Sequence, residues 1–127
     1  MHEIGLCEGV LGVALEASAG EPVRRVRVRV GRLQAVVPEV FDQSWTLVSE
    51  GTAADGSRLE LVEVPILLRC RACGQETEAP EPPLACRHCG SPDVQVETGD
   101  ELVVEEVELA AGEIRRNPTL AASGEER

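Results

Sequence analysis

The sequence has no tyrosine and no lysine, and it contains a single phenylalanine and a single tryptophan. Because aromatic residues make up only 2% of the chain, its core must consist mostly of valine, leucine and alanine. All twelve basic residues are arginine, and 23 acidic residues give a formal net charge of −11. Nucleic-acid binding depends on phosphate attraction and base stacking, so this composition predicts no nucleic-acid partner.

Long apolar runs are also missing, and the opening residues MHEIGL do not resemble a signal peptide. We therefore expect a cytoplasmic protein without membrane association, whose cysteines are kept reduced. The length of 127 residues suits one compact domain together with a small metal-stabilised one. The sequence contains no P-loop, and only His2 and His88 could be histidine bases, so we expect a protein that is not an enzyme.

Four of the five cysteines form two CxxCG motifs, with twelve residues between Cys73 and Cys86. Two thiolates on one tight turn can bind a metal ion, and two such turns complete a tetrahedral site. The intervening residues 74–85 contain three prolines, which disfavours a helix there. This spacing predicts a zinc ribbon with one structural Zn(II) held by Cys70, Cys73, Cys86 and Cys89.

Other interpretations of these cysteines agree less well with the sequence. Two disulfides would need an oxidising compartment, and a thioredoxin-like pair needs one CxxC motif at the start of a helix. A rubredoxin-like iron site also uses two such motifs, but those domains rely on an aromatic core, and Phe41 and Trp45 lie far upstream. The fifth cysteine, Cys7, lies near the apolar face of a predicted helix, and we expect it to be buried rather than reactive.

Hydrophobic periodicity predicts an α+β fold in which two helices pack on a small, about three-stranded sheet. The helices are expected at residues 4–18 and 38–50, with Phe41 and Trp45 in the core. Strands are expected at 23–30, 59–64 and 101–109, and a further short strand at 94–97. The arginines that alternate along 23–30 predict a face that is solvated or neutralised by acidic residues of neighbouring strands.

The zinc ribbon interrupts this sheet in the sequence. We expect an α/β domain at residues 1–64 plus 98–110, with the zinc ribbon at 65–97 inserted between two of its strands. Residues 111–127 show no pattern, which predicts a disordered tail.

The amino terminus carries a second possible metal site. The terminal amine of Met1, the amide and imidazole of His2 and the amide of Glu3 could place four nitrogens in a plane, which suits Ni(II) or Cu(II). From the residues alone the alternative stays open that His2 is only an exposed, mobile side chain.

Several blocks of the sequence resemble the HypA/HybF family of nickel-insertion accessory proteins, which act in the maturation of [NiFe]-hydrogenase. They include MHEIGLCEGV, VRVRVG, PEVFDQSW, DGSRLELVEVP, the CxxCG pair and GDELVVEEVEL, in the same order over residues 1 to about 110. The resemblance implies a nickel site at Met1, His2 and Glu3 and structural zinc at the four paired cysteines. It also implies two partners, a nickel-handling GTPase and the hydrogenase large-subunit precursor, and in some organisms a role with urease maturation factors.

Some members carry histidines beside these cysteines, whereas this chain has only His88, inside the second motif. The leading hypothesis is a nickel metallochaperone that binds Ni(II) as cargo and performs no turnover. The alternative is a zinc-ribbon adaptor for protein interactions, in which the amino terminus has no nickel function.

Overall fold

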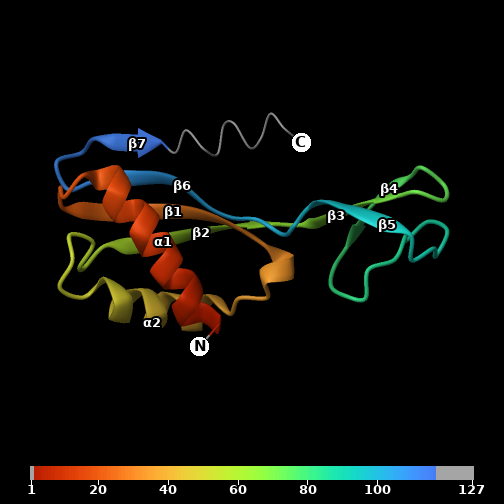
Figure 1. Ribbon diagram of the computed structural model, residues 1–127, viewed down its shortest axis with the longest axis horizontal. Coiled ribbons are helices and arrows are strands. Elements are labelled where there is room, and N and C mark those ends of the chain that lie inside the picture. The colour runs from red at the N-terminus through yellow and green to blue at the C-terminus, as the bar shows by residue number, and fades with distance from the viewer. Residues whose placement is uncertain (1, 117–127) are drawn as a thin grey trace. The chain divides into compact units, whose positions relative to one another are not determined.

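The computed structural model describes residues 2–116, except for the side chain of His2. Helix α1 spans His2–Ser18 and helix α2 spans Pro38–Ser49, with a short 3-10 helix at Arg32–Gln34. The strands are β1 Val23–Gly31, β2 Arg58–Val64, β3 Ile66–Cys70, β4 Glu76–Ala79, β5 Val94–Thr98, β6 Leu102–Leu109 and β7 Ile114–Arg116 (Figure 1). These elements confirm the predicted α+β class with a ribbon-like insertion.

A four-stranded sheet in the order β2-β1-β6-β7 forms the scaffold of the first unit. The strand count exceeds the expected three because β7 pairs antiparallel with β6, with Ile114 opposite Glu108. Arg116 strengthens this pairing through an ion pair of 3.3 Å with Glu106. The expectation of a disordered tail from residue 111 is therefore wrong for residues 114–116, and residues 117–127 lie outside the described residues.

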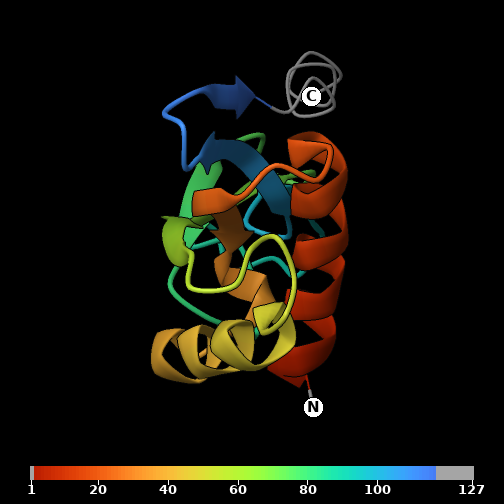
Figure 2. The same cartoon turned by 90° about the vertical axis from the view of Figure 1, so that its left-hand side faces the viewer.

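Helix α1 crosses the strands of this sheet and meets α2 at its amino-terminal end (Figures 1 and 2). The predicted aromatic pair fills the core: Phe41 is fully buried and Trp45 is 1% exposed. The indole nitrogen of Trp45 donates to the hydroxyl of Ser57 at 3.0 Å, so its polar atom is satisfied. Valine and alanine are the most frequent of the remaining buried apolar residues, in keeping with the shortage of aromatics.

The second unit comprises residues 30–35 and 63–102. A three-stranded sheet in the order β4-β3-β5 carries its small core of Ile66, Leu68 and Ala79. The predicted ribbon, residues 65–97, is shorter than this unit. Residues 30–35 join it because the amide of Gly31 donates to the carbonyl of Glu101 at 2.7 Å, and Leu33 packs against the small core.

The insertion has a simple topological basis. β2 and β6 lie in the four-stranded sheet, and the chain between them forms β3, β4 and β5 of the other sheet. The predicted placement of the cysteine motifs between two strands of one sheet is therefore confirmed. Neither helix α1 nor helix α2 is long and apolar enough to span a membrane.

Candidate metal centre

The two CxxCG motifs fold into two tight turns with the same hydrogen bonds. In the first, the amide of Cys70 donates to Gln75 and the amide of Gly74 donates to Cys70, both at 2.9 Å. In the second, Cys86 donates to Ser91 and Gly90 donates to Cys86, both at 2.8 Å. The two glycines adopt φ values of 79° and 83°, in the left-handed region that favours glycine.

These turns bring the four sulfurs together. The Sγ atoms of Cys70 and Cys89 lie 3.6 Å apart, and those of Cys73 and Cys86 lie 3.7 Å apart. All four sulfurs lie within 4.8 Å of one another. Because Zn–S bonds measure about 2.3 Å, a tetrahedral zinc site needs sulfurs about 3.8 Å apart. The cluster therefore fits a structural zinc ion with no open ligand position.

Backbone amides point at two of the sulfurs. Sγ of Cys86 accepts from the amides of Cys89 at 3.4 Å and His88 at 3.3 Å, and Sγ of Cys70 accepts from the amide of Cys73 at 3.4 Å. These bonds, with that from Cys89 the largest, lower the pKa of Cys86 to about 6, and the amide of Cys73 lowers the pKa of Cys70. A lowered pKa favours the thiolate, the form that binds metal.

The carbonyls that close these turns belong to Gln75 and Ser91, which the sequence did not single out. No sequence signal could have found them, because every residue type supplies the same carbonyl. His88 contributes its backbone amide to Cys86, and its exposed side chain does not belong to the four-sulfur cluster.

The other predicted metal site is described only at Glu3. The Glu3 carboxylate accepts a hydrogen bond from the backbone amide of Val37 at 3.2 Å, which ties the start of α1 to the start of α2. Met1 and the side chain of His2 lie outside the described residues.

Cys7 is a core residue, as predicted. Its side chain is fully buried, and its thiol donates to the carbonyl of Phe41 at 3.4 Å. Burial, followed by the charges of Glu3 and Asp42, raises the pKa of Cys7 to about 11. A raised pKa keeps the thiol protonated at neutral pH, the form that is a poor metal ligand and a poor nucleophile.

The arginine-rich face of β1 is neutralised by its neighbours, which confirms that prediction. Arg25 pairs with Glu60 on β2 and with Glu106 and Glu108 on β6 at 2.9–3.0 Å. Arg27 pairs with Glu60 at 2.6 Å, and Arg29 reaches Glu105 at 3.6 Å. These arginines are therefore engaged within the sheet.

The HypA family model, described as "Hydrogenase/urease nickel incorporation, metallochaperone, hypA", matches residues 1–109. The chain belongs to the HypA family. It is 37% identical over 109 residues to the hydrogenase maturation factor HypA of Trichormus variabilis, covering 86% of this chain and 96% of the relative. It is 38% identical to the HypA of Acidithiobacillus ferrooxidans over 112 residues, which covers 86% of this chain and 99% of that relative.

The fold has counterparts among solved HypA structures. The solution structure of the Ni metallochaperone HypA from Helicobacter pylori superposes with a TM-score of 0.63 at 20% identity, covering 86% of this chain and 97% of that one. A second HypA solution structure gives the same TM-score at 21% identity and covers 87% and 98% of the two chains. At this level of identity the comparison supports the fold.

Proposed function

We propose that this protein is a nickel metallochaperone that binds Ni(II) at its amino terminus and delivers it during maturation of [NiFe]-hydrogenase. The observation that carries the proposal is the HypA family match over residues 1–109. The four-sulfur cluster supports a division of labour, because a closed site with four protein ligands suits a resident structural ion. The nickel cargo then needs ligands elsewhere.

Met1, His2 and Glu3 are the proposed nickel ligands. Helix α1 begins at His2, and the first four amides of a helix have no acceptor within it. The amide nitrogens of His2 and Glu3 are therefore not needed by the helix and can join the Met1 amine and the His2 imidazole around a tetragonal ion. Ligands at a helix end also let an acceptor protein approach and remove the metal by ligand exchange.

Zinc has a different role in this proposal. The hydrophobic cluster at the centre of the second unit is small: Ile66, Leu68 and Ala79 are buried, and a few partly buried side chains pack against them. Such a small core needs a further constraint, and a zinc ion held by Cys70, Cys73, Cys86 and Cys89 would supply it.

The proposed partners are a nickel-handling maturation GTPase, the hydrogenase large-subunit precursor and, where the organism has urease, its maturation factors. The sequence contains no P-loop, so a nucleotide-driven step would belong to the GTPase. The chain itself carries and transfers nickel without turnover, and cytoplasmic location follows as part of this proposal.

Nickel delivery to the large-subunit precursor tests this function. Untagged protein that starts at Met1 is loaded with one equivalent of Ni(II) and mixed with the precursor in the presence of a chelator that captures free nickel. We expect transfer from the wild type and little from His2→Ala, whose zinc content should be unchanged. Equal nickel incorporation from both proteins, or from nickel salt alone, would favour the zinc-ribbon adaptor instead.

The pH dependence of nickel binding gives an independent readout of the ligands. The terminal amine and the imidazole must both lose a proton to bind, and their ordinary pKa values are about 7.7–8.0 and about 6.5. Nickel affinity should therefore fall steeply as the pH drops through this range.

A further inference from the structure

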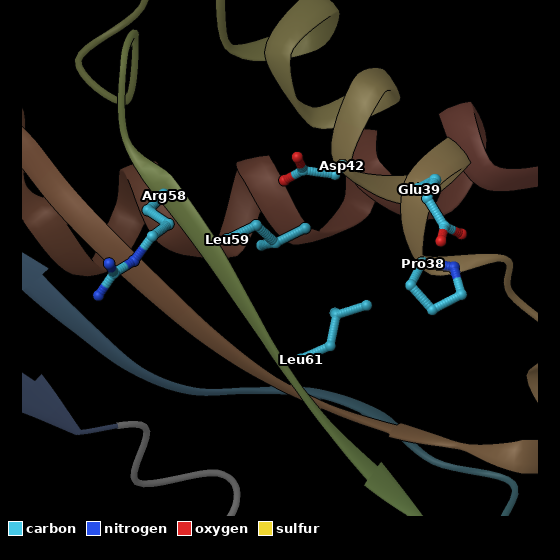
Figure 3. Close-up of a pocket in the computed structure, with 6 residues that line it drawn as sticks. All are labelled: Pro38, Glu39, Asp42, Arg58, Leu59 and Leu61. Carbon is cyan, nitrogen blue, oxygen red and sulfur yellow. The ribbon is translucent and has the colours of Figure 1, made fainter.

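A groove runs between helix α2 and strand β2 (Figure 3). It has a volume of about 440 Å³, is open to solvent and is lined by six residues from these two elements. The side chains of Leu59 and Leu61 form an apolar floor on the β2 side, while α2 contributes Pro38, Glu39 and Asp42. Arg58 completes the lining at the beginning of β2.

Strand β2 lies at the edge of its sheet, with β1 as its one strand neighbour among the described residues. An edge strand presents backbone N–H and C=O groups that can pair with another chain. Proteins usually protect such edges with charged side chains, proline or a bulge. The seven residues RLELVEV contain no proline, and the carboxylates of Glu60 and Glu63 are engaged in ion pairs with Arg25 and Arg32. The groove therefore offers backbone hydrogen-bonding groups beside an apolar floor, which are the two requirements for binding an extended peptide.

The charges of the groove indicate which peptide fits. Helix α2 presents two exposed carboxylates to the groove, those of Glu39 and Asp42, and the guanidinium of Arg58 points away from them (Figure 3). The chain as a whole carries a net charge of −11, so an acidic peptide would also be repelled at longer range. Side chains of an added strand alternate between two sides. An apolar residue can cover Leu59 and Leu61 while a lysine or arginine reaches the carboxylates of α2.

The groove also ends close to Glu3, one of the proposed nickel ligands. The Glu3 carboxylate is bound to the amide of Val37, the residue that immediately precedes Pro38 of the groove lining. Nearby, the buried thiol of Cys7 on α1 donates to the carbonyl of Phe41 on α2, one residue before Asp42 of the groove lining. A chain bound in the groove would therefore lie next to the start of α1.

We propose that this groove docks an extended segment of a protein partner, rich in alternating apolar and basic residues, which adds a strand to the free edge of β2. The inference rests on the proposed function, because docking here would hold a nickel acceptor near the start of α1, where the nickel ligands are proposed. The proposed partner would contact the edge of β2 and the groove between α2 and β2, both on the first unit.

Hydrogen exchange with two charge-matched peptides tests the docking site. The probes are a short capped peptide of alternating valine and lysine and its counterpart with glutamate in place of lysine, added to zinc-loaded, nickel-free protein. We expect the lysine peptide to bind and to slow exchange of the β2 amides, and the glutamate peptide to do neither. Binding of both peptides with similar affinity, or binding without protection of β2, would overturn the proposal.

Two variants on the same strand sharpen the test. Leu59→Lys places a charge on the groove floor, whereas Val62→Lys adds the same charge to a side chain that is already 38% exposed and points to the other side of β2. We expect Leu59→Lys to weaken lysine-peptide binding by about tenfold or more and Val62→Lys to change it by less than about twofold. Equal weakening by the two variants would contradict a groove-specific contact.

Nickel titration of the same proteins separates this inference from the proposed function. If Leu59→Lys binds nickel like the wild type but the lysine peptide never protects β2, the docking site is wrong and the metallochaperone proposal stands. If the peptide binds as expected but the wild type binds no nickel, the docking site stands and the metallochaperone proposal is wrong.

Discussion

The guanidinium of Arg25 donates to three carboxylates, from Glu60, Glu106 and Glu108, and only 11% of its side chain is exposed. Glu106 is the most deeply buried of these acids, at 4% exposure. Removing a buried charge costs more than the pair contributes, because the remaining partner keeps its desolvation penalty. Arg25 thus explains how an acidic chain can keep several carboxylates on one sheet face.

Arg25→Met should lower the free energy of unfolding by about 2–3 kcal/mol, since it leaves Glu106 with fewer donors. Arg71→Met is the matched control. Arg71 pairs with Asp93 at 3.0 Å, but both side chains are more than half exposed, so its loss should cost less than about 0.5 kcal/mol. Urea denaturation of the two variants measures the difference, and equal losses would show that the network adds no stability.

The same network predicts a pH dependence. The hydrogen bond from Arg25 lowers the pKa of Glu108, and that from Arg27 lowers the pKa of Glu60. A lowered pKa in the folded state means that the stabilisation is present above the ordinary carboxyl pKa of about 4.3 and is lost as the pH falls below it. Wild-type stability should therefore drop between about pH 5 and pH 3, and Arg25→Met should show a smaller drop. Parallel pH profiles would contradict this assignment.

At the scale of elements, hydrophobic periodicity was sufficient to predict a helix or strand wherever the pattern extended over enough residues. The alternation from Val26 onward and the helical spacing around Phe41 and Trp45 gave β1 and α2 close to their observed bounds. The short strands β3, β4 and β7 escaped prediction because five, four and three residues show no clear period. These strands form by pairing: β3 pairs with β4, and β7 pairs with β6. So short a stretch of sequence does not show which strand will be its partner.

The four cysteines of the candidate site could be predicted because metal ligation restricts residue type and spacing together. The boundary of the second unit could not be predicted, because it depends on a close approach between the backbones of Gly31 and Gly99. A Cβ atom on Gly31 would lie about 2.0 Å from the carbonyl oxygen of Gly99. Such a requirement concerns residues 68 positions apart, and a single sequence does not show it.

Gly31→Ala should therefore destabilise the protein by about 3 kcal/mol or more, because backbone atoms rather than a flexible side chain must move. Gly12→Ala is the matched control: nothing lies within 4 Å of its added Cβ, and alanine favours a helix interior. The control should stabilise α1 by about 0.5–1 kcal/mol. Thermal unfolding measures both changes. An unchanged stability of Gly31→Ala would show that the backbones of Gly31 and Gly99 do not need to lie this close.

At the scale of the whole molecule, the two units differ in what stabilises them. The first unit has a core that contains Phe41 and Trp45. The second has the small buried cluster of Ile66, Leu68 and Ala79 together with the four-cysteine cluster. Trp45 is the only tryptophan, so its fluorescence reports on the first unit alone.

Cys86→Ser should remove the zinc and the amide protection of β3, β4 and β5 while the emission of Trp45 stays that of a buried indole. Hydrogen exchange and fluorescence on the same sample measure the two units separately. A zinc-free variant that keeps its β3 protection would show that the metal does not fold this unit, and loss of the buried Trp45 signal would show that the units fold together.

The most direct test of the account is the metal content of untagged protein by native mass spectrometry with added Ni(II). Three forms are compared: the wild type, the wild type acetylated at the α-amine of Met1, and Cys86→Ser. We predict one zinc and one nickel for the wild type, zinc without tightly bound nickel after acetylation, and nickel at the terminus without zinc in Cys86→Ser. If the acetylated protein still holds one nickel tightly, the cargo site is not the amino terminus and the central claim is wrong.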